Sequence, residues 1–196
     1  SAGPIAGITQ YGGTGKCLVC SISPMTDIPI DSNVGGYFGP FLKFSGFDVI
    51  ELTGKAEEDV IIVIDGNKGT VSIEKAPLEH KDAHVLGEEL TTMYAEDDND
   101  RKNVAVVCSG SAADHCNLSM LNFTFYDPKR NVVRLKQAGR GGIGRVFADK
   151  HIKALVCHFK GVKANLNHVY DISILNRDGL KFHREVATQD DKQNSM

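Results

Sequence analysis

The stretch Lys136-Gln137-Ala138-Gly139-Arg140-Gly141-Gly142-Ile143-Gly144 is the part of the sequence from which a fold and a ligand can first be inferred. Its four glycines leave little side chain between a ligand and the backbone, and glycine adopts the positive φ values that let consecutive N–H groups point into one concavity. Residues 145–152 have the composition of a short helix. A glycine turn at the start of a helix can bind a phosphate, because free N–H groups and the positive end of the helix dipole point toward it. We therefore expect an anion site here; the alternative is a structural turn beside a solvated basic face.

The charges around this stretch favour an anionic ligand. From residue 129 to residue 163 the sequence contains ten lysines and arginines and one acid, Asp149, in a chain whose net charge is −3. A nucleic acid is not the expected ligand, because a single Arg-Gly-Gly without repeats or interleaved aromatic residues is weak evidence for RNA binding.

A second glycine pair, Gly35-Gly36, stands in a similar context earlier in the chain. It precedes a short segment at 40–44 and an expected strand at 47–52, just as Gly141-Gly142 precedes the short helix and an expected strand at 153–157. The similarity predicts two repeats, about 16–76 and 103–163, each with a phosphate site. The ligand would then be two like molecules or one molecule with two phosphate ends.

The composition is that of a globular domain. With 196 residues and 41% hydrophobic residues, the chain can bury a core as one domain or two small subdomains. No apolar run approaches the ~20 residues of a membrane span. The odd number of cysteines, five, fits reduced thiols in a cytoplasm better than a disulfide framework. Both ends look unfinished, so we expect a fragment of a longer protein or one subunit of a split one.

Strands and a few helices alternate along the chain. Strands are expected at 16–22, 103–108 and 118–126, a hairpin at 60–64 and 70–74, and helices within 77–100 and at 169–185. The β-branched run at 60–64 predicts a strand buried on both faces. In the first helix, Val85, Leu86, Leu90 and Met93 would form an apolar stripe. This pattern predicts an α+β fold. Cys17 and Cys20 form a C-x-x-C pair, but residues three apart on a strand face opposite sides, so buried thiols are expected rather than a metal or redox pair.

Five motifs together resemble one known domain. The chain resembles the N-terminal domain of the tungsten-containing aldehyde ferredoxin oxidoreductases through motifs that occur in the family's order and spacing: Ser1-Ala2-Gly3-Pro4, Ser23-Pro24-Met25-Thr26, Ser32-Asn33-Val34-Gly35-Gly36-Tyr37-Phe38-Gly39, Leu42-Lys43-Phe44-Ser45-Gly46-Phe47-Asp48 and Ala138-Gly139-Arg140-Gly141-Gly142-Ile143-Gly144. The resemblance implies an α+β fold of two twisted, mostly antiparallel or mixed β-sheets in a pseudo-duplicated arrangement. These sheets would form a saddle for a bis-pterin tungsten cofactor. Residues 1–163 would form this domain, and 164–196 a helix and linker toward further domains.

The resemblance also assigns roles to residues. Asn33 and Gln137 would supply backbone carbonyls to a Mg2+ ion that bridges the two pterin phosphates, and Lys136 would reach a phosphate. Lys16 stands where the family usually has an arginine linking the pterin to the iron–sulfur cluster; lysine keeps the charge but loses the fork of donors. Gln137 stands where a small residue is common, which leaves a carbonyl ligand intact. The remaining expected cofactor contacts are Gly35, Gly36, Ala138, Gly139, Arg140 and Gly141.

The chemistry implied is the two-electron oxidation of an aldehyde to a carboxylic acid at tungsten. Electrons would leave through a 4Fe–4S cluster to ferredoxin or another iron–sulfur electron-transfer subunit. The cluster ligands and the catalytic acids would lie outside this chain, which would carry no catalytic residue. Two alternatives stay open: a related tungsten enzyme that reduces aromatic-CoA or carboxylic acids, and a non-catalytic module that binds a phosphorylated ligand or another subunit. All tungsten readings require Asn33 and Gln137 to lie on the same side of the molecule.

Overall fold

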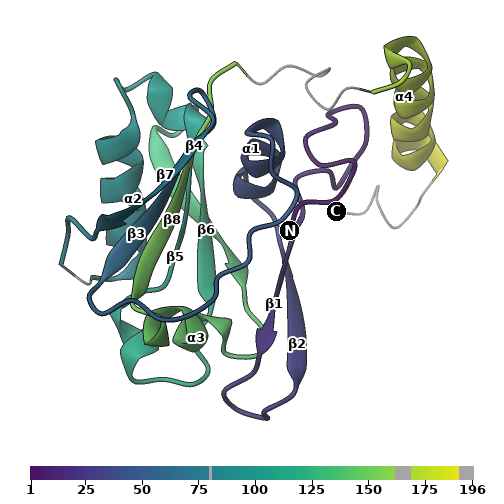
Figure 1. Cartoon of the computed structure of the whole chain (residues 1–196). Helices are drawn as coiled ribbons and strands as arrows, with labels where there is room; N and C mark the ends of the chain where they lie inside the picture. Colours follow the sequence, from purple (N-terminus) through teal and green to yellow (C-terminus); the bar gives the residue numbers. More distant parts are fainter. Residues whose placement is uncertain (80, 162–168, 190–196) are drawn as a thin grey trace.

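Two β-sheets make up most of the molecule. The computed structural model describes residues 1–79, 81–161 and 169–189 (Figure 1). A small sheet of two antiparallel strands consists of β1 (Cys17–Ile22) and β2 (Pro29–Val34). A large sheet has six strands in the order β4-β3-β8-β5-β6-β7; they are β3 (Val60–Asp65), β4 (Thr70–Lys75), β5 (Val104–Cys108), β6 (Leu121–Asp127), β7 (Val132–Ala138) and β8 (Ile152–His158). Because β3 and β8 are parallel and the other pairs are antiparallel, the large sheet is mixed. The expected α+β class with two sheets is confirmed.

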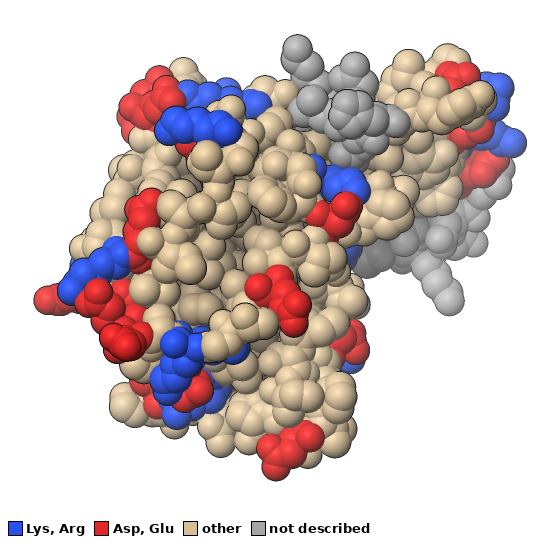
Figure 2. Space-filling view, viewed as in Figure 1, with Lys and Arg blue, Asp and Glu red and all other residues tan. Residues whose placement is uncertain are grey.

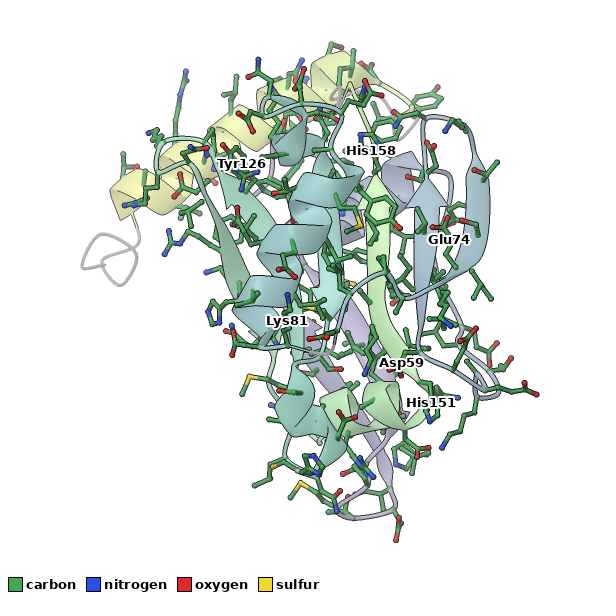
Figure 3. All side chains as sticks on the ribbon, turned by 90° about the vertical axis from the view of Figure 1, so that its left-hand side faces the viewer. Asp59, Glu74, Lys81, Tyr126, His151 and His158 are labelled. Carbon is green, nitrogen blue, oxygen red and sulfur yellow. The ribbon has the colours of Figure 1, made fainter. Side chains whose placement is uncertain are left out.

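Helices cover both faces of the large sheet. One face carries α2 (Ala83–Tyr94), and Figure 3 shows this helix over the strands. The opposite face carries the small sheet and two short helices, α1 (Phe38–Phe44) and α3 (Ile143–Asp149). Two 3-10 turns flank β5: η1 (Asp100–Asn103) lies between α2 and β5, and η2 (Ser111–Asp114) lies between β5 and β6.

The central strands explain why both faces are covered. Successive side chains of a strand point to opposite faces, and in β3 this places Ile61 with Leu86 and Leu90 of α2. The neighbouring Ile62 joins the core on the other face, which contains aromatic residues of α1 and α3. The expectation that the β-branched run at 60–64 is a strand buried on both faces is therefore confirmed.

The structure differs from the expected elements in three places. Residues 47–52 are not a strand: they have no ladder partners in the described chain, and Asp48 lies in a bend. Strands β2 and β7 were not expected, because their sequences lack an unbroken apolar alternation. In α2 the expected apolar stripe is only half buried, since Val85 and Met93 are 44% and 47% exposed while Leu86 and Leu90 are buried.

The same order of elements occurs twice in the chain. Each half contains a hairpin, a glycine pair, a short helix and a strand: β1, β2, α1 and β3 in the first half, and β6, β7, α3 and β8 in the second. The strand that corresponds to β8 is β3, its parallel neighbour in the large sheet, and not the segment 47–52 expected from the sequence. A division into repeats at about 16–76 and 103–163 remains a prediction.

The last described element is α4 (Ile172–Gln189), close to the expected helix at 169–185. A Cβ built on its Gly179 would lie 2.6 Å from the Gln10 backbone oxygen, so the helix packs closely on the N-terminal segment. Several of its apolar side chains are exposed, including Leu180 at 56% and Phe182 at 43%. Residues 190–196, which belong to the expected linker, lie outside the described residues. None of the described helices is both long and apolar enough to cross a membrane.

Candidate functional site

The two glycine turns lie next to each other because β2 and β7 run side by side. A Cβ built on Gly35, just after β2, would lie 3.9 Å from Lys136 Cγ. At the other end of the contact, a Cβ built on Gly141, after β7, would lie 2.5 Å from Ile30 Cγ1. Asn33 and Gln137 fall between these two contacts in their respective strands. The structure thus places both residues at one junction between the sheets, on the same side of the molecule.

The first glycine turn rests on strand β6 and on the loop before β1. Gly36 has a φ of +107°, and a Cβ there would lie 3.4 Å from the Thr124 carbonyl oxygen. A Cβ on Gly15 would lie 3.3 Å from the Gly36 oxygen. This packing carries the exposed Lys16 to the same turn. Lys16, Gly35, Gly36 and Lys136 are therefore brought together, although they are up to 120 residues apart in the sequence.

The second glycine turn has a buried half and an exposed half. Gly142 has a φ of +69°, and a Cβ on it would lie 2.0 Å from the Asn117 oxygen. The Gly144 N–H donates to the Ser119 oxygen at 2.9 Å. The segment at 117–120 therefore covers the N-terminus of α3, and the expected anion site with free helix N–H groups is wrong at that point. The exposed half consists of Lys136, Gln137, Gly139 and Arg140, while Ala138 is fully buried.

Most of the basic segment is used in structural contacts. Its cations pair with acids or bond to backbone oxygens: Arg130 and Arg134 with Asp127, Lys153 with Asp59, Lys160 with Glu96, Arg145 with two carbonyls of η2, and Lys150 with the Gly54 carbonyl. Among the described residues of the segment, the side chains of Lys129, Lys136 and Arg140 form neither an ion pair nor a hydrogen bond. Two of these three cations belong to the second glycine turn. Their charge is therefore available to a ligand at the junction.

Aromatic side chains hold Lys136 at this position. Its Nζ lies 5.8 Å from the centre of the Phe125 ring, which belongs to the neighbouring strand β6. Arg134 Cζ lies 5.7 Å from the centre of the same ring. Tyr37, from the first glycine turn, meets Phe125 edge-on at 5.9 Å between ring centres. Such contacts attract a cation and leave its head near solvent. Sequence reasoning missed Phe125 and Tyr37. The pairing of β6 with β7 places Phe125 beside Lys136, and the fold brings Tyr37 to the same ring.

The junction fits a phosphate-bearing cofactor in its chemistry. Lys16, Lys136 and Arg140 supply charge on an exposed face. A Cβ on Gly139 would find no atom within 4 Å, so a ligand can approach the backbone there. Strand β2 is paired on one edge only and β7 is the last strand of the large sheet, and unpaired strand edges present N–H and C=O groups. Phosphates bind to cationic side chains and backbone N–H groups. Mg2+ binds to oxygen atoms such as backbone carbonyls. The junction has groups of both kinds.

The cysteines do not form a cluster site. Cys17, Cys108 and Cys157 are buried, and Cys20 and Cys116 are exposed. Burial raises the pKa of the Cys108 and Cys157 thiols to about 12, which disfavours the thiolates that metals bind. Among the described residues no three histidine, cysteine or acidic side chains gather as a metal site. Cys17 is buried and Cys20 is exposed, which fits opposite sides of one strand, but the expectation of a buried thiol is wrong for Cys20.

Comparison with known proteins gives a consistent picture. The sequence profile described as "Aldehyde ferredoxin oxidoreductase, N-terminal domain" matches residues 1–159. Tungsten-containing aldehyde ferredoxin oxidoreductases from Pyrococcus horikoshii and Pyrococcus furiosus are 35% and 33% identical over 156 and 160 residues, which is 80% and 79% of this chain. In both cases the match spans only 23% of the relative.

A solved structure shares the fold. It is the active-site complex of a benzoyl coenzyme A reductase with 1,5-dienoyl-CoA, and it superimposes with a TM-score of 0.64 at 27% identity. The alignment covers 81% of this chain and 22% of that chain.

Proposed function

The chain belongs to the aldehyde ferredoxin oxidoreductase family, as its N-terminal domain, and we propose that it holds the phosphates of a tungsten bis-pterin cofactor. The observation that carries the proposal is the junction between β2 and β7. There two glycine turns, each expected to contact one pterin, meet beside three exposed cations.

The residues at the junction would bind different parts of the cofactor. The Asn33 and Gln137 carbonyls would take a Mg2+ ion between the two phosphates, because hard cations prefer oxygen ligands. Lys136 would donate to a phosphate, held over Phe125 so that little side-chain entropy is lost on binding. Gly35 and Gly139, whose Cβ positions have no close contacts, would let the pterins approach the backbone, with Arg140 beside them. Gly36 and Gly141 instead leave room for protein atoms and Ala138 is fully buried, so their expected direct contact with the cofactor is not proposed. Lys16 would place a further charge at the first turn.

When bound, the cofactor would supply the two-electron redox chemistry at tungsten. The substrate would be an aldehyde, oxidised to a carboxylic acid. A 4Fe–4S cluster held outside this chain would pass electrons to ferredoxin or another iron–sulfur subunit. This chain would bind and orient the cofactor and supply no proton-transfer group. The five free thiols of the structure fit a cytoplasmic location.

A matched pair of variants in the native enzyme tests this assignment. Lys136→Met removes a charge-assisted hydrogen bond, which is worth about 1.5–3 kcal/mol, so we expect the cofactor to be retained roughly ten-fold less well. Gln137→Ala keeps its carbonyl and should retain the cofactor fully. Tungsten content by mass spectrometry and pterin content by fluorescence, both measured after gel filtration, are the readouts. Equal loss in both variants, or native enzyme without tungsten and molybdenum, would contradict the proposal.

A second candidate comes from the structural similarity to a benzoyl coenzyme A reductase. A related tungsten enzyme that reduces aromatic-CoA or other carboxylic acids would use the same junction, because the substrate contacts lie outside this chain. Turnover of aldehydes with a ferredoxin-like acceptor, compared with turnover of aromatic-CoA thioesters, distinguishes the two. A protein that retains no pterin would instead be the non-catalytic phosphate-ligand or subunit-binding module.

A further inference from the structure

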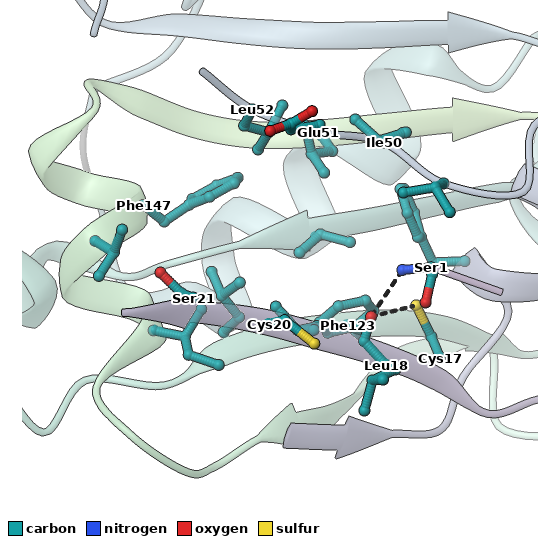
Figure 4. Close-up of a pocket in the computed structure, with 18 of the residues that line it drawn as sticks. Ser1, Cys17, Leu18, Cys20, Ser21, Ile50, Glu51, Leu52, Phe123 and Phe147 are labelled. Atoms are coloured by element: carbon teal, nitrogen blue, oxygen red, sulfur yellow. Dashed lines mark hydrogen bonds between the residues drawn. The ribbon is translucent and has the colours of Figure 1, made fainter. Parts of the chain in front are cut away.

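A second open surface lies away from the glycine turns. A cavity of about 600 Å³ opens between β1, the segment 49–52 and the large sheet (Figure 4). Its floor consists of buried side chains of the main core, including Phe38, Leu42, Phe123, Phe147 and Leu155. The surrounding face of the molecule is largely uncharged, with Lys and Arg mostly close to Asp and Glu (Figure 2). The core is therefore exposed along this cavity, which we call the slot.

One wall of the slot is an unpaired strand edge. Ser1 and Leu18 exchange two backbone bonds: the Ser1 nitrogen donates to the Leu18 oxygen at 2.7 Å and the Leu18 N–H donates to the Ser1 oxygen at 2.9 Å. In an antiparallel ladder alternate residues point the same way, so the N–H groups of Cys20 and Ile22 face the same edge as that of Leu18. Within the described residues, this edge has no partner other than Ser1 and Ala2.

The other wall is the segment 47–52. Its sequence, Phe-Asp-Val-Ile-Glu-Leu, is mostly apolar and contains β-branched residues, as expected for a strand, yet among the described residues it forms no ladder. Ala2 touches both walls: it forms a bridge with Cys17 of β1, and its N–H donates to the Asp48 oxygen at 2.9 Å. Residues Ser1 and Ala2 therefore occupy one end of a slot that is wide enough for one extended chain.

We propose that a β-strand from a part of the longer protein outside residues 1–196 fills this slot. It runs antiparallel to β1 in line with Ser1 and Ala2, pairs with the edge from Val19 to Ile22, and gives the segment 47–52 its missing partner. Alternate side chains of this strand are apolar, because they meet the apolar floor. The chain spans 23% of the length of its relatives, so polypeptide of the same protein is available for this role.

Exposure of the walls supports an occupant from the same protein. Ile22 is 55% exposed and Val49 is 60% exposed, although both border the core. An edge strand with exposed apolar side chains promotes aggregation when it is left open. A strand belonging to the same protein covers such an edge permanently, whereas a second copy of this chain would cover it only above a certain concentration.

Hydrogen exchange in the native protein tests the proposal. Fragment-level mass spectrometry should show the Cys20 and Ile22 amides exchanging roughly 100-fold or more below their unprotected rate, at all protein concentrations. Rates near the unprotected value would overturn the proposal. Protection that disappears on dilution would also overturn it, since the occupant would then be a second copy. The readout does not require tungsten, so its failure is distinct from failure of the proposed cofactor function.

A pair of variants adds a readout that does not depend on assigning amides. Val49→Asp places a carboxylate against the occupant, so we expect the thermal midpoint of the native protein to fall and the Cys20 and Ile22 amides to exchange faster. Val85→Asp, at a 44% exposed position on α2 over the opposite face of the large sheet, is the control and should change neither. A Val49→Asp protein that matches this control in both measurements would contradict a filled slot.

Discussion

Two glycines of the second turn, Gly139 and Gly142, have different surroundings and should respond differently to the same change. Gly142→Ala places a methyl group in the left-handed region and 2.0 Å from the Asn117 oxygen, so we expect the enzyme to lose about 2 kcal/mol or more of unfolding free energy. Gly139→Ala meets no atom within 4 Å and should leave stability unchanged while weakening cofactor retention. Urea unfolding and tungsten content measure the two effects. Equal stability of both variants would contradict the described turn.

A buried acid far from the junction links stability to pH. Burial alone would raise the pKa of the Asp100 carboxyl, but hydrogen bonds from the Asn103 side chain and the Glu96 N–H, together with the charges of His158 and Lys160, lower it below its ordinary value of 3.8. A carboxyl with a lowered folded-state pKa stabilises the protein above its unfolded-state pKa, and this stability is lost as the pH falls through the folded-state pKa.

The Asp100→Asn variant tests this linkage. At neutral pH we expect it to lose about 1–3 kcal/mol of unfolding free energy, because charged hydrogen bonds are removed from a buried site. The gap between variant and wild type should narrow as the pH falls from about 5 to about 2, since wild type then protonates Asp100 and loses the same contribution. Urea unfolding of both proteins across this pH range measures the difference in their unfolding free energies. If this difference in unfolding free energy did not change with pH, the charge of Asp100 would contribute nothing to stability.

At the scale of elements, the pairing of β5 with β6 depends on a side chain. The paired residues are Val107 with Phe123 and Cys108 with Asn122, and beyond them the Val106 N–H donates to Thr124 Oγ1 at 2.8 Å. Thr124→Val would leave a buried N–H without an acceptor, and we expect a loss of about 1–3 kcal/mol.

Thr91 of α2 provides the matched control for this change. It is also fully buried, but its hydroxyl has no hydrogen-bond partner in the described chain. Thr91→Val should therefore be neutral or slightly stabilising. Thermal unfolding of both variants compares them directly, and a larger loss for Thr91→Val would contradict the assigned hydrogen bonds.

The same elements show what sequence could predict and what it could not. The hairpin of β3 and β4 was predictable because a β-branched run, a glycine-containing turn and a second run are local signals. Strand β7 was not, since Arg134, Lys136 and Gln137 point to solvent and hide its alternation. The segment 47–52 has the sequence of a strand but has no ladder partner in the part of the chain that the structure describes, and a strand exists only when it is paired.

The candidate site was predictable to a similar extent. Residues of the glycine pairs were identified from composition and resemblance, because glycines and cations at a turn are visible in sequence. The burial of the α3 N-terminus by 117–120 was not, since Gly144 meets Ser119 only through the fold. The contact of Lys136 with Phe125 likewise depends on strand pairing.

At the scale of the whole molecule, three surfaces are left open. They are the junction between β2 and β7, the slot beside β1, and the apolar side chains of α4. The junction is the proposed site of the cofactor and the slot is the proposed site of the added strand. The chain spans 23% of the length of its relatives. The proposed cofactor and the proposed strand occupy different surfaces, so each can be tested without the other.

The proposed function requires that both glycine turns bind the same cofactor molecule. Crystals of the native enzyme, measured with anomalous diffraction at the tungsten edge, locate the metal relative to the protein directly. We expect one tungsten peak over the face that joins β2 to β7, with the two pterin phosphates meeting between Asn33 and Gln137. A tungsten peak on any other surface of this domain, or crystals without tungsten or molybdenum, would contradict it.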